Sequence, residues 1–207
     1  MRILLSALLM GILIPSFSQD SVSRKVVPAI YFDYGKSIVS LEQNTLKLEG
    51  SAEVILSGKW QFVGEMGYWN LKPSSAIENG SYHVRGNYMR YGFGFLPWVS
   101  NESRFGVGVR FANSTYTDKV SYTITSDIQS DAQESFKRID QSANWYELVA
   151  YSDKKMNKWL TAGFNFRLRF GLTYEEQSPI DVVTIPGYGR AQDKIVPAMN
   201  LFVKIPF

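Results

Sequence analysis

The sequence predicts an all-β protein, a single closed antiparallel up-and-down transmembrane β-barrel of about eight strands. Three observations lead to this fold class. Apolar and polar residues alternate over many segments of roughly 10 residues, the length that a tilted strand needs to cross a bilayer. After the first 18 residues no apolar run is long enough for a transmembrane helix, and only helices and closed sheets satisfy their backbone polar groups in lipid. The 207 residues, 14% of them aromatic, suit one small barrel.

Residues 1–18 have the pattern of a cleaved signal peptide. A positive start at Arg2 is followed by an apolar run over residues 3–14 and by small residues at Ser16 and Ser18, so we expect cleavage before Gln19. The apolar run is too short to remain as a membrane anchor. The chain has no cysteine, which excludes a lipoprotein anchor, disulfides and zinc thiolate sites. We therefore expect an exported protein, with a periplasmic segment at 19–28 and the barrel at 29–207.

Eight segments have the length and the alternation of membrane strands. They are residues 29–41, 46–56, 59–71, 82–96, 104–118, 144–151, 159–172 and 194–207. In the second, Leu48, Gly50, Ala52, Val54 and Leu56 alternate with Lys47, Glu49, Ser51 and Glu53. We expect the first set to face lipid and the second the lumen.

The fourth, fifth and seventh segments repeat this alternation. The residues expected to face lipid are Met89, Tyr91, Phe93 and Phe95 in the fourth, Phe105, Val107, Val109 and Phe111 in the fifth, and Leu160, Ala162, Phe164, Phe166, Leu168 and Phe170 in the seventh. The alternates are glycines and polar residues, including several arginines. A soluble barrel would show the opposite arrangement, with its apolar side chains inside.

The last segment resembles the closing strand of outer-membrane β-barrels. From Met199 to Phe207 every second residue is apolar, and the chain ends on an aromatic ring. In that class of proteins the terminal Phe belongs to the signal that the barrel-insertion machinery recognises. The resemblance implies that Phe207 is an insertion signal and that the protein lies in the outer membrane.

The connections between the segments alternate in length. Residues 57–59, 97–103 and 152–158 are short turns, which we assign to the periplasm, and the long loops 72–81, 119–143 and 173–193 are assigned to the outside. The first connection, 42–45, is short as well. Residues 120–139 alternate weakly, so they form either an extracellular hairpin or two more membrane strands. Aromatic girdles are expected at Trp60, Trp98, Trp159 and Tyr151 on the inner edge and at Tyr68, Trp69, Tyr82 and Tyr116 on the outer edge.

Charged residues on the lumen side are expected to form an ion-pair network that plugs the barrel. Glu65 and Arg90 lie at similar depth on neighbouring strands, as do Arg110 and Glu147. The full set is Asp33, Glu49, Glu53, Glu65, Arg90, Arg110, Glu147, Arg167, Arg169 and Lys204. About eight strands enclose an interior that side chains just fill. The alternative is a gated, narrow pore for small solutes.

An enzymatic function has one set of candidate residues. The only histidine is His83, and Ser81, two residues earlier, shares its face of the strand, so a nucleophile and a base could meet with Glu78 as the orienting acid. Small barrels that deacylate or acylate lipid A use Ser and His near the outer leaflet, but the order here differs from the His-x-Ser arrangement of the deacylases. The glycines of residues 186–190 are explained by a turn, because no Lys-Ser/Thr and helix follow to make a phosphate site. We expect no catalysis, metal or cofactor.

Four stretches resemble an uncharacterised outer-membrane barrel family of Bacteroidota. They are Phe32-Asp33-Tyr34-Gly35-Lys36, Gly64-Glu65-Met66-Gly67-Tyr68, Tyr88-Met89-Arg90-Tyr91-Gly92-Phe93-Gly94 and Ile185-Pro186-Gly187-Tyr188-Gly189. This family implies no catalytic residues. With 22 basic and 19 acidic residues, the charge is too balanced to suggest nucleic-acid binding.

Three functions remain as hypotheses. The preferred one is a structural or docking barrel that works through an outer-membrane complex or a lipoprotein, beyond its contacts with outer-membrane lipid and, during biogenesis, the insertion machinery. The basic residues Lys154, Lys155 and Lys158 are a candidate contact for an acidic partner. The others are a narrow pore and a lipid A-modifying enzyme.

Overall fold

The computed structural model describes residues 27–33, 46–73, 77, 79–125, 132–176, 178 and 180–206. The long strands are β1 (Val27–Asp33), β2 (Leu46–Leu56), β3 (Trp60–Leu71), β4 (Gly80–Val99), β5 (Ser103–Ile124), β6 (Ala132–Lys155), β7 (Thr161–Tyr174) and β10 (Ile195–Pro206). A small hairpin consists of β8 (Thr184–Ile185) and β9 (Gly189–Arg190). In this part of the chain, no helix has the length and apolar character needed to cross a membrane. The predicted all-β class is confirmed.

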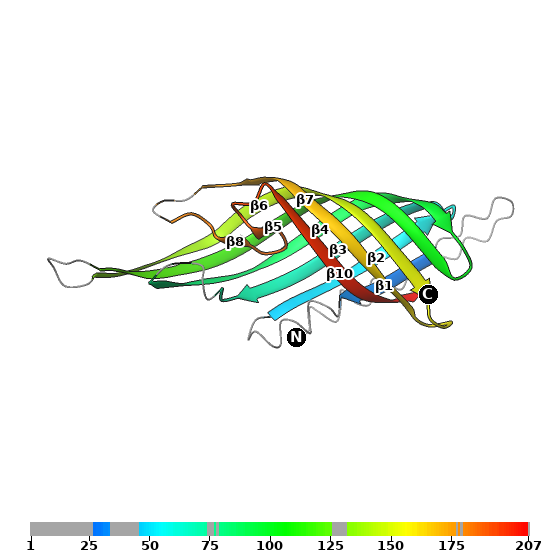
Figure 1. Cartoon of the computed structure of the whole chain (residues 1–207), viewed down its shortest axis with the longest axis horizontal. Helices are drawn as coiled ribbons and strands as arrows, with labels where there is room; N and C mark the ends of the chain where they lie inside the picture. The colour runs from blue at the N-terminus through cyan, green and yellow to red at the C-terminus, as the bar shows by residue number, and fades with distance from the viewer. Residues whose placement is uncertain are drawn as a thin grey trace, which may run out of the picture.

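The strands pair antiparallel in chain order, as Figure 1 shows for the long ribbons that wind side by side. Strands β2 to β7 and β10 form one curled sheet, in which β7 pairs with β10. The short strand β1 pairs with β10 on one side and β2 on the other, so the order of the strands is a ring. Each long strand thus pairs with a partner on either side.

Local turn chemistry fixes the β2–β3 connection. Ser57 and Gly58 have φ angles of 51° and 64°, and the Lys59 amide donates to the Leu56 carbonyl at 3.2 Å. Two successive positive φ angles are the signature of a type I′ turn, whose twist matches that of the strands it joins. Glycine at the second of these positions adopts this conformation without steric cost.

Large apolar side chains cover the outward face of most of the ring, and we call this surface the apolar belt. It includes Leu48, Phe62, Met66, Met89, Tyr91, Phe93, Val107, Val109, Tyr146, Leu148, Phe164, Phe166, Met199 and Leu201. Phe93, for example, is 55% exposed. The residues between them along each strand point inward, as the alternation in the sequence predicts.

At one end of the ring, β4, β5 and β6 continue beyond the belt as the polar extension, defined as residues 80–87, 113–124 and 132–144. The hairpin of β5 and β6 reaches furthest (Figure 1). Here most of the outward residues are polar, for example Arg85, Asn87 and Lys119, while Tyr82, Val84 and Val120 are buried inside. The same strands therefore reverse the polarity of their two faces at the edge of the belt.

The expected loop at 119–143 is wrong, because most of it is paired strand. The register runs from Tyr116 opposite Gln141 to Ile124 opposite Ala132, with one bulge. The alternative of an extended hairpin describes the structure, and no further strands enter the ring between β5 and β6 within the described residues. Its Ser- and Thr-rich outer face resembles a loop in sequence although it is a strand.

The expected loop at 173–193 is also different from the structure. β7 continues to Tyr174, and residues 180–193, which we call the inward segment, fold back into the end of the ring. Val182, Ile185 and Tyr188 are completely buried there and join the apolar cluster of the polar extension. The third expected loop, 72–81, is two residues too long at its end, because β4 begins at Gly80.

The expected limits of the first strand and the aromatic girdles need correction. β1 begins at Val27 rather than at 29, so the expected segment 19–28 overlaps it, and residues 34–41 lie outside the described part. The residues 1–18 and Phe207 also lie outside it. Trp60, Trp98 and Trp159 are exposed on the outward face, but Trp69, Tyr82, Tyr116 and Tyr151 are buried inside. The reason is parity: Trp69, for instance, is four residues from Glu65 and shares its inward face.

Candidate functional site

Charged side chains fill the middle of the ring, and we call them the central cluster. They are Glu49, Glu65, Arg90, Arg110, Glu147, Arg167 and Arg169, contributed by β2 to β7, and all are buried. Their inward direction follows from the strand period of two, which also places their apolar neighbours in the belt.

Arg90 on β4 binds carboxylates from three other strands. Its Nη1 lies 2.9 Å from Oε2 of Glu49 and 3.2 Å from Oε2 of Glu65, while its Nε donates to Oε1 of Glu147 at 2.8 Å. Nη2 donates to the Gly187 carbonyl of the inward segment at 2.9 Å. One guanidinium therefore joins β2, β3, β6 and the inward segment, which uses its fork of donors fully.

Arg167 on β7 crosses the interior to strands that are not its neighbours. Its Nη1 lies 2.6 Å from Oε2 of Glu65 on β3, and its Nη2 lies 3.4 Å from Oε1 of Glu49 on β2. Because β7 pairs with β6 and β10, these contacts span the ring. Charged side chains therefore meet in the middle of the interior.

Some ion pairs join register partners on adjacent strands, and others join residues that face each other across the interior. Glu65 and Arg90 are direct register partners and contact each other. Arg110 and Glu147 are also register partners, which confirms their expected similar depth, although the ion pair of Arg110 joins its Nε to Oε1 of Glu65 at 3.4 Å. Glu147 contacts Arg90, Arg167 and Arg169. Long side chains also form ion pairs with residues on non-adjacent strands. Similar depth on adjacent strands is therefore not sufficient to predict which charges pair.

A second group of charges, the basal cluster, lies toward the end opposite the polar extension. Nζ of Lys204 contacts Glu53 at 2.6 Å and Asp153 at 2.7 Å, and Arg104 donates two hydrogen bonds to Asp153 at 3.0 and 2.8 Å. Gln61 donates to Glu53. The sequence pattern does not single out Arg104 and Asp153, because Asp153 falls in the predicted turn 152–158. Its even spacing from Glu147 could have placed it on the inward face.

A third group links the polar extension to the inward segment. Tyr82 donates to Oδ2 of Asp118 at 2.9 Å, and Arg138 donates to both oxygens of Asp118 and to the Ile180 carbonyl at 2.7 Å. The sequence does not indicate the pairing of Asp118 with Arg138, because Arg138 lies within the expected loop 119–143. Deeper in the ring, Arg169 donates to the Tyr188 carbonyl at 2.6 Å. Three arginines thus hold the inward segment by its backbone carbonyls.

The candidate catalytic residues Ser81 and His83 have different interaction partners in the structure. Ser81 and His83 lie on the outward face of the polar extension, opposite Ser121 and Lys119. Nε2 of His83 is hydrogen-bonded to Oδ1 of Asn70 at 2.6 Å, so the imidazole contacts an amide rather than the serine. Burial, together with the charges of Lys72, Arg85 and Lys119, lowers the pKa of the imidazole, so the ring is neutral at pH 7.

Some of the candidate residues lie where no side chain is described. Glu78 and Phe207 are outside the described residues, and Asp33 belongs to β1, whose side chains are outside them too. Across the described ranges, no group of three or more His, Asp or Glu side chains is placed to hold a metal ion.

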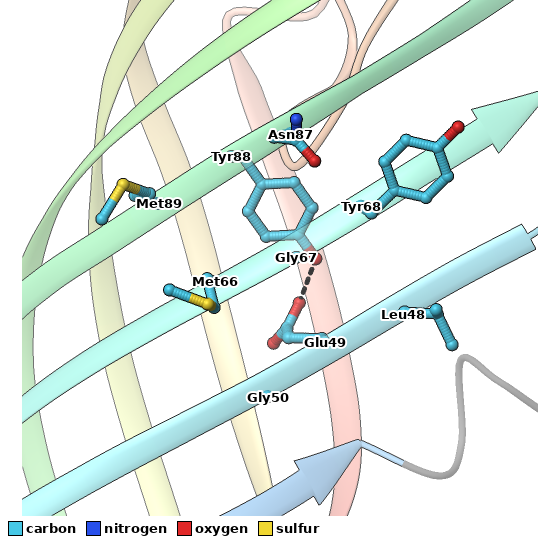
Figure 2. A pocket seen from close by; sticks show the side chains of 9 residues that line it. All are labelled: Leu48, Glu49, Gly50, Met66, Gly67, Tyr68, Asn87, Tyr88 and Met89. Atoms are coloured by element: carbon cyan, nitrogen blue, oxygen red, sulfur yellow. Dashed lines mark hydrogen bonds between the residues drawn. The ribbon is translucent and has the colours of Figure 1, made fainter. Parts of the chain in front are cut away.

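An apolar hollow of about 420 Å³ lies on the outward face of β2, β3 and β4. Figure 2 shows Leu48, Met66 and Met89 around it, with the hydrogen bond from Tyr88 to Glu49 behind. Gly67 has no side chain, which allows the ring of Tyr88 to lie against the backbone of β3. A Cβ at this position would lie 2.2 Å from Cζ of Tyr88. The aromatic ring thus covers the glycine from the inside, as a rescue of a strand glycine by a cross-strand partner.

Comparisons with known proteins give a family but no activity. The model of the family described as "Domain of unknown function (DUF6048)" matches residues 16–205. No curated protein matches the chain. The matched range contains all three charged groups, the inward segment and the apolar hollow.

Proposed function

From the premise that the chain belongs to the DUF6048 family, we propose that it is an integral outer-membrane β-barrel of structural or docking type. In this proposal the barrel neither catalyses a reaction nor conducts solutes, and its outward surface and connections bind a membrane or lipoprotein partner. The observation that carries the proposal is the combination of an apolar belt outside with charged clusters inside.

The belt supports a membrane location. Exposing apolar surface to water costs about 25 cal/mol per Å², and contiguous exposed apolar patches are rarely larger than a few hundred Å² on soluble monomers. Belt side chains such as Tyr91 and Phe166 are about half exposed around the ring. Lipid removes this cost, and the ring leaves few unpaired strand edges in it. The signal peptide predicted at 1–18 and the alternation of residues 199–206, which resembles a closing strand, support the outer membrane as the destination.

The filled interior supports a closed barrel. Arg90 and Arg167 join opposite walls, and the inward segment lies across the end next to the polar extension. Buried ion pairs of this kind contribute little net stability, yet breaking one leaves an uncompensated charge. The network therefore holds one closed arrangement.

Planar-bilayer recording tests the closed interior. The reconstituted protein is expected to give no conductance above that of bilayers without protein. A sustained, protein-dependent current would favour the alternative function, a narrow pore for small solutes.

Affinity purification tests docking. We expect the tagged protein, extracted from native outer membranes in mild detergent, to recover a stoichiometric partner that a tagged unrelated barrel does not. Charge reversal of the exposed residues Lys154, Lys155 and Lys158 is one matched variant, and excision of 125–131 is another, which leaves Arg138 in place. Recovery of the barrel alone in all cases would contradict the docking proposal.

Lipid A modification remains a separate candidate that can be tested directly. Under the proposal, lipid A mass profiles of wild type, a null strain, Ser81→Ala and His83→Ala are identical. A species that disappears in the null strain and in both variants would contradict the non-enzymatic assignment.

A further inference from the structure

Three hollows on the outward face of β2, β3 and β4 join into one apolar groove. Their volumes are about 420, 450 and 440 Å³. The first two share Gly50, Met66 and Met89, and the second and third share Ala52, Gly64 and Tyr91. We call the combined feature the acyl groove.

Small residues form the floor of the acyl groove. A Cβ added at Gly50 or at Gly64 would meet nothing within 4 Å, so the space above both glycines is open. Elsewhere in the belt this space is filled, for example by Phe164 and Phe166 on β7. From Phe62 to Tyr68 the groove follows β3 for roughly 20 Å, which exceeds one leaflet, about half of the ~30 Å hydrocarbon core.

The groove ends at a polar hollow in the polar extension. Tyr68 and Asn87 line both the groove and this hollow of about 310 Å³, to which Arg85, Thr115, Thr117 and Asp140 also contribute. Arg85 lies opposite Thr117 in the register. The hollow thus offers a guanidinium, an amide and two hydroxyls beside one carboxylate.

Cations gather on the outward face around this hollow. Lys119 lies opposite both His83 and Lys137, and Arg85 lies opposite Asn70, close to the exposed Lys72 at the end of β3. Among the described residues, Lys72, Arg85 and Lys119 form no ion pair. By contrast, the end of β7 is followed by the exposed Glu175 and Glu176.

We propose that this face binds a phosphorylated lipid, with an acyl chain in the acyl groove and the phosphate at Arg85, Lys119 and Lys72. The inference rests on the proposed membrane location. Arginine and lysine donate charge-assisted hydrogen bonds to phosphate oxygens. The hydroxyls of Thr115 and Thr117 add neutral donors. The apolar groove and the polar hollow with its neighbouring cations lie in the order in which a lipid presents its chain and its headgroup at a bilayer surface.

The test is native mass spectrometry of the full protein in mild detergent, titrated with diphosphoryl lipid A and with its dephosphorylated form. We expect at least a tenfold preference for the phosphorylated lipid. Arg85→Glu combined with Lys119→Glu is expected to abolish the preference. Gly50→Leu combined with Gly64→Leu fills the groove and is expected to weaken binding of both lipids, whereas Ala162→Leu and Lys158→Glu, on other surfaces, leave binding unchanged.

Equal binding of the two lipids, or binding that the groove and charge variants do not alter, would overturn the inference. Crosslinking from a photoreactive residue at Met66 provides a second readout in native membranes. Capture of lipid supports the proposal, and capture of a polypeptide in place of lipid contradicts it. Insertion of the protein into lipid vesicles is measured separately: failure to insert rejects the membrane proposal, while insertion without lipid preference rejects only this inference.

Discussion

The strands β4, β5 and β6 contribute to both the apolar belt and the polar extension, yet their side chains follow opposite rules in the two regions. On β4, the outward residues change from Ser81, His83, Arg85 and Asn87 to Met89, Tyr91, Phe93 and Phe95. The inward residues change in the reverse sense, from Tyr82 and Val84 to Arg90. The strand period is the same in both regions, so the difference lies in what surrounds them. The extension has an apolar inside and a polar outside, and the belt region has an apolar outside and a largely charged inside.

The interior side chains of the two regions are held together by different interactions. In the extension, an apolar cluster that includes Tyr82, Val84 and Val120 packs against Ile185 and Tyr188 of the inward segment, and burial of apolar surface stabilises it. The interior enclosed by the belt is held by ion pairs and hydrogen bonds, beside two smaller apolar clusters, one around Leu96 and Val149 and one of Val63 and Phe202. The inward segment touches both regions through Gly187 and Ile180.

The largest effect is expected from Arg90→Met, which breaks the central cluster of the belt region. It leaves Glu49, Glu65 and Glu147 without one of their shared cations, and removing one partner of a buried ion pair costs about 3–5 kcal/mol. The free energy of unfolding, measured by urea titration in vesicles, gives this value. A loss below about 1 kcal/mol would mean that the cluster behaves like a solvated surface pair.

The next largest effect sharpens the boundary between the regions. Leu148→Arg places a charge in the belt and is expected to cost about 2–4 kcal/mol. Asn144→Arg, four residues earlier on the outward face of the same strand, is expected to change stability by no more than about 0.5 kcal/mol. Equal losses of unfolding free energy for the two substitutions, measured by the same titration, would show that positions 144 and 148 have the same surroundings and would contradict a boundary between them.

Gly187→Ala tests the contact that joins the two regions. Gly187 has a φ angle of 86°, and a Cβ there would lie 2.6 Å from Cγ of Tyr88. We expect a cost of about 1–3 kcal/mol, the range for a strained backbone position. Protease sensitivity of residues 180–193 should rise with it. An unchanged digestion pattern and stability would show that the inward segment is not held at this point.

The smallest effect probes the packing of the extension. Ile185→Val removes one methylene from a completely buried side chain and is expected to cost about 0.5–1.5 kcal/mol. Ile195→Val, at a position 62% exposed, is the matched control with a smaller effect. If the two substitutions had the same cost in thermal unfolding, Ile185 would not be part of a packed core.

The sequence predicts the belt better than the extension, for a physical reason. Glu49 to Leu56 alternate so regularly that the limits of β2 agree with the structure, and the inward charges follow from the same period. In the extension, outward Ser and Thr residues such as Ser121 and Thr123 resemble a loop. Their strand character depends on pairing with residues 132–138, which is a long-range contact.

The inward segment was harder to predict than either region. Residues 180–193 contain Pro186 and two glycines, which indicate turns in sequence but not the direction in which the turn points. Its position depends on Arg90, Arg138 and Arg169, which bind its carbonyls from three strands. The pairing of Arg110 with Glu65 likewise depends on reach across the ring.

A cysteine scan of the outward face of β4 tests the central claim most directly. The natural chain contains no cysteine, so a spin label at position 81, 83, 85, 87, 89, 91, 93 or 95 is unique. In lipid vesicles, we predict that labels up to 87 are accessible to a water-soluble relaxation agent and that labels from 89 onward are accessible to oxygen dissolved in lipid. Uniform access to the water-soluble agent along the whole strand would contradict the account, because the belt would then face water.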